Sequence, residues 1–296
     1  MSDTVFTPAG LDALPPAEMA RKAEAVGEAK VGLPVLTTLA LSVLAGAFIA
    51  LGAIFATTIM SNGDTFPYGA NRMLGGVAFS LGLILVVVAG AELFTGNNLI
   101  VMAWASRRVS TARLLSNWSL VWIGNFAGAI ATAGIMYYTR QYTFGHGAVG
   151  TTALTIANAK TGLGWGQALA LGVFCNALVC LAVWLSYGAR SVTDKILAVV
   201  FPITAFVAAG FEHSVANMYF ISIGLFVKHD HTWLASLGSK APETSNLTWT
   251  HFLWGNLVPV TIGNIVGGAL MVGAVYWFVY LRRSREPAPA EVAPDL

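Results

Sequence analysis

Two short polar segments interrupt otherwise apolar stretches of the chain, and they hold the residues best suited to chemistry. The first segment covers residues 90–98 and contains Glu92, and the second covers residues 210–217 and contains Glu212 and His213. An ionisable residue inside a membrane span is costly to bury, so each of these marks a candidate functional site.

His213 has the chemistry to handle a small anion. A neutral imidazole can bond an anion through its N–H, whereas a protonated one supplies charge, so a pH near about 6.5 would matter. A His that only bonds a neighbouring helix is the structural alternative. Glu92 and Glu212 would repel anions, so we predict that they are buried structural carboxylates that anchor backbone N–H groups or helix interfaces.

The composition sets the class of protein. Apolar residues make up 56% of the 296 residues, and charged residues only 10%. Soluble domains carry about 25% charged residues, so the sequence indicates a polytopic membrane protein. The net charge of +2 provides no basic footprint for nucleic acid. Cys175 and Cys180 lie in one apolar stretch and are predicted to be small core residues.

Six charge-poor stretches are long enough to cross a bilayer, which takes about 20 apolar residues as a helix. They cover residues 35–60, 73–105, 114–138, 163–187, 196–227 and 254–281. We predict a cytoplasmic segment with a surface helix over 1–34, a transmembrane pore domain over 35–283 and a disordered cytoplasmic tail over 284–296. Lys and Arg favour one side by eleven to five, which predicts that both termini are cytoplasmic.

The second and fifth stretches are too long for simple spans. Each runs roughly 32 residues, about 48 Å as a helix, against a hydrocarbon thickness of about 30 Å. Because the polar segments fall in their middles, we predict two broken helices. Unpaired backbone groups survive at membrane depth only in protein or beside a wet cavity. The N-termini of half-helices suit an anion.

The two halves of the chain repeat each other. Residues 89–92 and Asn97 match residues 209–212 and Asn217 at a constant offset of 120. Residues 123–125 and 128–129 likewise match 262–264 and 267–268. With three spans per half, the halves must insert with opposite topology. Broken helices at matching places in an inverted 3+3 repeat are a sequence indication of a transport site.

The same segments resemble the signature motifs of the formate/nitrite transporter family, and most closely its formate-channel branch. They are GAELFTGN at 90–97, GFEHSVANM at 210–218, PVTIGN at 259–264 and LAVWLSYGARS at 181–191. The resemblance spans roughly residues 15–283. It implies an all-α, aquaporin-like protomer with six transmembrane helices, assembled as a homopentamer in membrane lipid with one pore per protomer.

The resemblance also implies pore residues. His213 would face Thr95 at the pore centre, with Asn176 and Lys160 near the path. The flanking constrictions would comprise Phe79, Leu83, Leu93, Phe94 and Phe206. Glu92, Asn97, Glu212 and Asn217 would be structural residues of the two loops.

The function predicted from these features is pH-sensitive transport of formate across the bacterial inner membrane. A small anion that gains a proton from His213 escapes much of the cost of entering an apolar constriction. Within the family, nitrite, hydrosulfide, acetate or lactate remain alternative substrates. A membrane-embedded enzyme is a distant alternative, since the sequence offers no cluster of metal ligands and no nucleophile with a base. We therefore expect no enzyme activity, cofactor or metal.

Overall fold

The computed structural model describes residues 13–61 and 66–282, so the expected tail over 284–296 lies outside the described residues. Within those ranges the regular structure is helical. The α-helices are α1 (Pro16–Val31), α2 (Val35–Met60), α3 (Tyr68–Ile84), α4 (Phe94–Asn97), α5 (Val101–Ala105), α6 (Thr111–Tyr138), α7 (Ala148–Thr161), α8 (Trp165–Gly188), α9 (Val192–Ala209), α10 (Ser214–Lys228), α11 (His231–Leu237), α12 (Val258–Ile265) and α13 (Val275–Tyr280). Three π-helical segments extend them, at Leu85–Gly90, His251–Leu257 and Val266–Ala274.

Six helical segments are long and apolar enough to cross a membrane, as predicted. They are Val35–Met60, Tyr68–Gly90, Thr111–Tyr138, Trp165–Gly188, Val192–Ala209 and His251–Tyr280. The last comprises α12, α13 and two π-helical segments. Large apolar side chains such as Leu36, Phe201 and Trp254 are exposed on these helices, which suits a surface that faces lipid.

The second and fifth spans are broken where the sequence predicted. The helix that starts with α3 ends at Gly90, and α4 begins at Phe94. In the other half, α9 ends at Ala209 and α10 begins at Ser214. Gly90 and Gly210 close the first half-helices with φ of +86° and +74°, a region that glycine enters without the steric cost of a Cβ.

Asn125 of α6 stabilises the first break. Its Oδ1 accepts a hydrogen bond from the backbone N–H of Phe94 at 2.9 Å. Its amide nitrogen donates to the carbonyls of Ser42 at 2.8 Å and Glu92 at 2.9 Å. Asn125 is fully buried. One side chain therefore joins the broken span to both neighbouring helices and satisfies backbone groups that no water could reach.

Asn264 of α12 does the same for the second break. Its Oδ1 accepts from the N–H of Ser214 at 2.9 Å, and its amide nitrogen donates to the carbonyls of Gly172 at 2.8 Å and Glu212 at 3.0 Å. Each group is the counterpart of one at the first break. The inverted repeat therefore extends to individual hydrogen bonds, beyond the similarity of glycine-rich helices.

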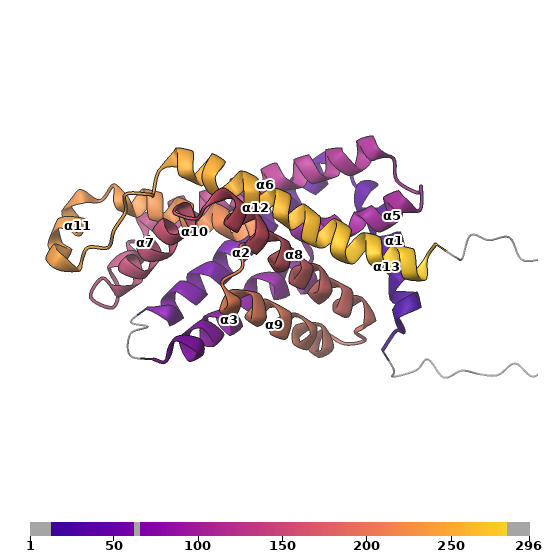
Figure 1. Ribbon diagram of the computed structural model, residues 1–296, viewed down its shortest axis with the longest axis horizontal. Helices are drawn as coiled ribbons and strands as arrows, with labels where there is room; N and C mark the ends of the chain where they lie inside the picture. The colour runs from indigo at the N-terminus through magenta and orange to yellow at the C-terminus, as the bar shows by residue number, and fades with distance from the viewer. Residues whose placement is uncertain (1–12, 62–65, 283–296) are drawn as a thin grey trace, which may run out of the picture.

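Each half also has a surface helix, at opposite ends of the molecule (Figure 1). α1 and the end of α13 lie at one end, and α7 and α11 lie at the other. The sequence predicts a surface helix at α1, whereas α7 was not predicted. The two helices are equivalent, because Lys30 near the end of α1 and Lys160 near the end of α7 are 130 residues apart, and each is followed by a glycine two positions on.

The end that carries α7 is held by a small polar and aromatic cluster. Asp230 caps α11 by accepting from the N–H of Trp233 at 3.0 Å, and it accepts from the Tyr142 hydroxyl at 2.6 Å. Burial and this hydrogen bond raise the pKa of Tyr142 to about 12. The Tyr142 ring packs edge-on against Trp233. The cluster fixes the start of α7 and, through that helix, the position of Lys160.

Glycines allow the spans of each half to approach closely. A Cβ added at Gly128 of α6 would lie 2.0 Å from the carbonyl oxygen of Val43, and one at Gly267 would lie 1.9 Å from that of Val173. Contacts of this kind are typical of membrane helices that meet through small residues. The two contacts are again repeat equivalents.

We expect Gly128→Ala to destabilise the protein, because α6 must move away from α2. Gly134→Ala is the matched control, since a Cβ at Gly134 meets nothing within 4 Å in the same helix. The control should be neutral or gain up to about 1 kcal/mol from better helix propensity. Thermal unfolding in detergent measures both variants. Equal unfolding temperatures would contradict the close-packing account.

Candidate transport pore

The two breaks meet at the centre of the molecule, where Thr95 and His213 contact each other. The Thr95 Oγ1 lies 3.1 Å from the His213 Nε2. Thr95 belongs to α4, and His213 is the N-cap residue of α10. Both side chains are buried. The starts of two half-helices, with their partial positive charges, therefore converge on the pair that the resemblance placed at the pore centre.

The capping hydrogen bond sets the protonation state of His213. Its Nδ1 accepts a hydrogen bond from the backbone N–H of Ala216 at 3.0 Å. A nitrogen that accepts cannot carry a proton, so the ring in this geometry is neutral with its proton on Nε2. His213 is therefore arranged to donate from Nε2 to Thr95 or to an anion. A second proton on Nδ1 would require the cap to break.

Apolar side chains lie on both sides of this pair. On one side, Phe79 and Phe206 pack edge-to-face with ring centroids 5.7 Å apart, and Phe206 also stacks on the His213 ring at 5.9 Å. On the other side are Leu83 and Leu93. All four side chains are at most 3% exposed. Apolar side chains therefore flank the central polar pair on both sides.

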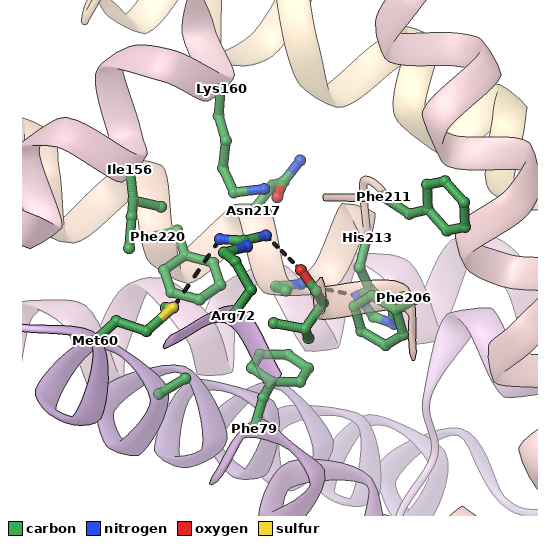
Figure 2. Close-up of a pocket in the computed structure, with 13 residues that line it drawn as sticks. Met60, Arg72, Phe79, Ile156, Lys160, Phe206, Phe211, His213, Asn217 and Phe220 are labelled. Atoms are coloured by element: carbon green, nitrogen blue, oxygen red, sulfur yellow. Dashed lines mark hydrogen bonds between the residues drawn. The ribbon is translucent and has the colours of Figure 1, made fainter. Parts of the chain in front are cut away.

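A cavity, here called the Lys160 cavity, opens beyond the phenylalanines (Figure 2). Its volume is about 50 Å³, whereas one water needs roughly 10–15 Å³, so a small anion with a few waters fits. Its lining residues are Ala56, Met60, Arg72, Phe79, Ile156, Lys160, Phe206, Val207, Phe211, His213, Ala216, Asn217 and Phe220.

A larger cavity, here called the Lys30 cavity, opens beyond the leucines with a volume of about 470 Å³. It is lined by both leucines, Leu83 and Leu93, and by Lys30, Glu92 and Tyr187 among others. The two cavities and the barrier between them describe a path from one end of the protomer to the other. The structure thus brings together His213, Lys160, Phe79 and Phe206 at one cavity and Leu83 and Leu93 at the other.

Glu212 is held by a lysine and two asparagines. Its Oε1 lies 2.7 Å from the Lys160 Nζ, and its Oε2 accepts from Asn217 at 2.6 Å and Asn256 at 3.2 Å. Asn217 also donates to the Asn256 Oδ1 at 2.7 Å. Glu212 is 4% exposed, so nearly all of its charge is compensated by protein groups.

Glu92 repeats this arrangement at the opposite end. Its Oε1 lies 2.6 Å from the Lys30 Nζ, and its Oε2 accepts from Asn97 at 2.7 Å. Asn97 in turn donates to Asn117 at 3.0 Å. Both glutamates are buried, and of the two expected roles their contacts match the helix interface rather than backbone N–H groups, because the carboxylates bind lysine and asparagine side chains. Each carboxylate thereby ties a surface helix to a broken span.

Two of the residues expected at the path contact scaffold groups. Asn176 is fully buried, and its amide nitrogen donates to the Asn264 carbonyl at 2.7 Å and the Thr95 carbonyl at 3.3 Å. The Phe94 ring packs edge-on against Trp118 at 6.3 Å. Neither residue lines either cavity. Asn176 is placed to hold the Thr95 backbone, and Phe94 to anchor α4.

Sequence reasoning missed several residues of the pore. Lys30 and Arg72 were counted only as charges that set orientation, yet both line a cavity. Asn125 and Asn264 lie inside a recognised repeat, which was used only as an indication of the inverted topology. The available signal was the repeat itself, because a polar residue kept at equivalent positions of both halves has a role that packing alone does not require.

The repeat fails at the pore centre. At the constant offset of 120, the counterpart of His213 is Leu93 and the counterpart of Thr95 is Val215. The scaffold residues match in both halves, whereas the two polar residues at the centre do not.

Among the described residues, no group of three or more His, Cys, Asp or Glu side chains could hold a metal ion.

Six spans in an inverted repeat, two of them broken around a buried central path, define a membrane transport protein of the channel type. The sequence profile of formate/nitrite transporters matches residues 17–278. The chain belongs to the formate/nitrite transporter family.

Several named relatives are similar to this chain over nearly the full length of both proteins. The formate channel FocA of Escherichia coli strain K12 is 43% identical over 276 residues, which cover 92% of this chain and 96% of the relative. FocA of Haemophilus influenzae is 39% identical, with 88% and 93% covered. A solved pentameric formate channel with formate bound is 41% identical with a TM-score of 0.79, covering 84% of this chain and 98% of that one. An FNT family ion channel aligns with a TM-score of 0.76 at 26% identity, covering 88% of this chain and 98% of that one.

Breaking the Lys160–Glu212 pair should destabilise the fold. We expect Lys160→Met to cost about 3–5 kcal/mol, because it leaves a buried carboxylate unpaired. Adding Glu212→Gln to Lys160→Met should recover part of that loss, since the amide keeps acceptors for Asn217 and Asn256 without charge. Thermal unfolding of the single and double variants measures the coupling. Additive losses in the double variant would mean that the two groups do not interact.

Proposed function

We propose that this chain transports formate across the bacterial inner membrane through a pore in each protomer of a homopentamer. The carrying observation is the buried His213 Nε2, which lies between two apolar constrictions where the starts of two half-helices meet. The named relatives that are formate channels support the substrate, and the pentameric relative supports the assembly.

The proposed path runs from one lysine-bearing cavity to the other. An anion loses water as it passes Phe79 and Phe206 or, from the other end, Leu83 and Leu93. At the centre it replaces the Thr95–His213 hydrogen bond and accepts one from Nε2–H. The partial charges of the half-helix starts offset part of the desolvation cost. Binding stays weak because the site offers no fixed full charge, which permits release.

Proton supply makes the transport sensitive to pH in this proposal. His213 is neutral in the observed geometry, and a neutral imidazole does not give its remaining N–H proton to formate. The proton comes from solvent in the cavities, either directly onto formate or first onto the His213 Nδ1 while the Ala216 cap is broken. In the second case the imidazolium gives one proton to formate and returns to the neutral ring. A carboxylic acid that crosses in its neutral form avoids the cost of a bare charge in a dry constriction. Protons in the cavities therefore promote passage.

The same chemistry admits other small monovalent anions. Nitrite resembles formate in size and charge and could accept the same hydrogen bond, and hydrosulfide, acetate and lactate are further alternatives. Competition between formate, nitrite and hydrosulfide for flux into proteoliposomes determines the order of preference. We propose no enzyme activity, because the named relatives are channels and the family is one of transporters.

The proposed arrangement in the membrane follows the charges. Residues 1–34 form a cytoplasmic segment that includes α1, residues 35–283 form the pore domain, and 284–296 form a cytoplasmic tail. The Lys30 cavity then faces the cytoplasm and the Lys160 cavity faces outward. The described ends of the chain, α1 and α13, lie at the same end of the molecule (Figure 1), which supports this orientation.

His213→Phe is expected to abolish formate flux in proteoliposomes, because no donor remains between the constrictions. His213→Asn is the sharper variant, since asparagine is a good N-cap residue and can replace the Nδ1 contact to Ala216 without supplying Nε2. We expect it to assemble as wild type and to lose at least about tenfold in flux. Native mass spectrometry checks the pentamer. Wild-type flux in either variant would overturn the role of His213.

Formate influx is expected to rise as the outer pH is lowered from about 7 to about 5, because each unit increases the neutral fraction of a carboxylic acid about tenfold. Simple anion conduction would show no such rise, because it gains nothing from protons. Stopped-flow measurement of flux at fixed total formate tests this. A flat profile would show that passage does not involve a proton.

A further inference from the structure

The two cavities differ in net charge. Arg72 and Lys160 line the Lys160 cavity, and none of its described lining residues is Asp or Glu. The Lys30 cavity is lined by one charge of each sign, Lys30 and Glu92. Because Glu212 pairs with Lys160 from outside the cavity lining, the surplus positive charge of the Lys160 cavity belongs to Arg72.

The guanidinium of Arg72 lies in the middle of that cavity, between Lys160 and the Phe79–Phe206 constriction (Figure 2). One terminal nitrogen donates to the Val207 carbonyl near the end of α9, and the other lies 4.0 Å from the Met60 sulfur. The Nε–H is buried and has no partner. Throughout 13–61 and 66–282, no ion pair includes Arg72. Among the described residues, the cation thus has an unused donor and no ion-pair partner.

The repeat shows that the shared scaffold does not need this cation. At the offset of 120, the residue equivalent to Arg72 is Val192, which is 56% exposed at the start of α9. The half-helix ends are otherwise alike. The backbone N–H of Ala91 donates to the Val86 carbonyl at 3.1 Å, and the backbone N–H of Phe211 donates to the Phe206 carbonyl at 3.0 Å. One half therefore ends its broken helix without a guanidinium, so Arg72 is an addition specific to the Lys160 cavity.

We propose that Arg72 forms an anion-collecting subsite for small monovalent oxyanions in the Lys160 cavity, which makes the pore bind its substrate more tightly from this face than from the Lys30 face. The inference rests on the proposed function. A guanidinium presents planar N–H donors that suit a carboxylate or nitrite group. Cations in a cleft with low-dielectric walls raise the local concentration of anions.

The position of the subsite fits a waiting place ahead of the barrier. An anion on the free Nε–H of Arg72 would lie in the cavity that Phe79 and Phe206 line, and His213 is the next neutral donor along that lining. The hydrogen bond to Val207 holds the guanidinium at the cavity and keeps it from following the anion inward. Arg72 is accordingly a positioning residue for entry, and His213 acts at the centre.

The test compares formate uptake from each face. Intact cells present one face to added formate, and inverted membrane vesicles present the other. Arg72→Gln keeps a donor for Val207 but removes the charge, and Arg72→Lys keeps the charge. Lys240→Gln, an exposed lysine in the turn Gly238–Lys240, is the control for general loss of surface charge. The half-saturating concentration and maximal flux are measured at low and high salt, and thermal unfolding is measured for each variant.

Arg72→Gln is expected to raise the half-saturating concentration about tenfold at the Lys160 face, the lower end of focusing effects, and to leave the Lys30 face unchanged. The difference should shrink at high salt, and Arg72→Lys should stay within about twofold of wild type. Equal constants for Arg72→Gln and wild type would overturn the proposal. So would equal losses of stability in Arg72→Gln and Arg72→Lys, which would assign Arg72 to holding α9. A wild-type protein that moves neither formate nor nitrite would instead refute the proposed function.

Discussion

The structure depends on one requirement, that a backbone broken inside a membrane must still satisfy its polar groups. Hydrocarbon offers no hydrogen bonds, so the four half-helix ends near the centre need partners from the protein. Asn125 and Asn264 supply them, and each also fixes a neighbouring span. Glu92 and Glu212, paired with Lys30 and Lys160, then hold the surface helices α1 and α7 against the broken spans. Once these polar groups are satisfied, the half-helix starts can face a common point, and that point becomes usable for an anion.

The symmetry of the scaffold and the asymmetry of the pore have different physical origins. Supporting groups occur in pairs because each half has a broken helix whose backbone polar groups need hydrogen-bond partners, and the two halves have opposite orientations. His213 and Thr95 do not, because one donor and one hydroxyl suffice at a centre that both halves share. Arg72 breaks the symmetry again at a cavity. Comparing the halves of one chain therefore separates residues that maintain the fold from residues that act on the solute.

Hydrophobicity and spacing were sufficient to predict the six spans, the two breaks and the inverted repeat, because each leaves a local pattern. The central position of His213 also followed, since it is ionisable within a span. The partners of the glutamates did not, because Lys30 and Lys160 lie 62 and 52 residues away along the chain. Arg72 looked like an ordinary charge at a span end, and α7 is too short and mixed in polarity to stand out. Phe94 lies in a quoted motif and Asn176 lies outside the motifs on α8, and in neither case does the sequence alone show which way the side chain points.

The glycine contacts have a consequence for how the path can open. With Gly128 against Val43 and Gly267 against Val173, the spans meet backbone to backbone and have no slack for sliding or tilting. Opening must then come from rotation of the constriction side chains, such as Phe79 and Leu83, about their own bonds. Rotamer changes are orders of magnitude faster than helix displacements. Close packing within each half therefore leaves side-chain rotation as the fast way to open the path.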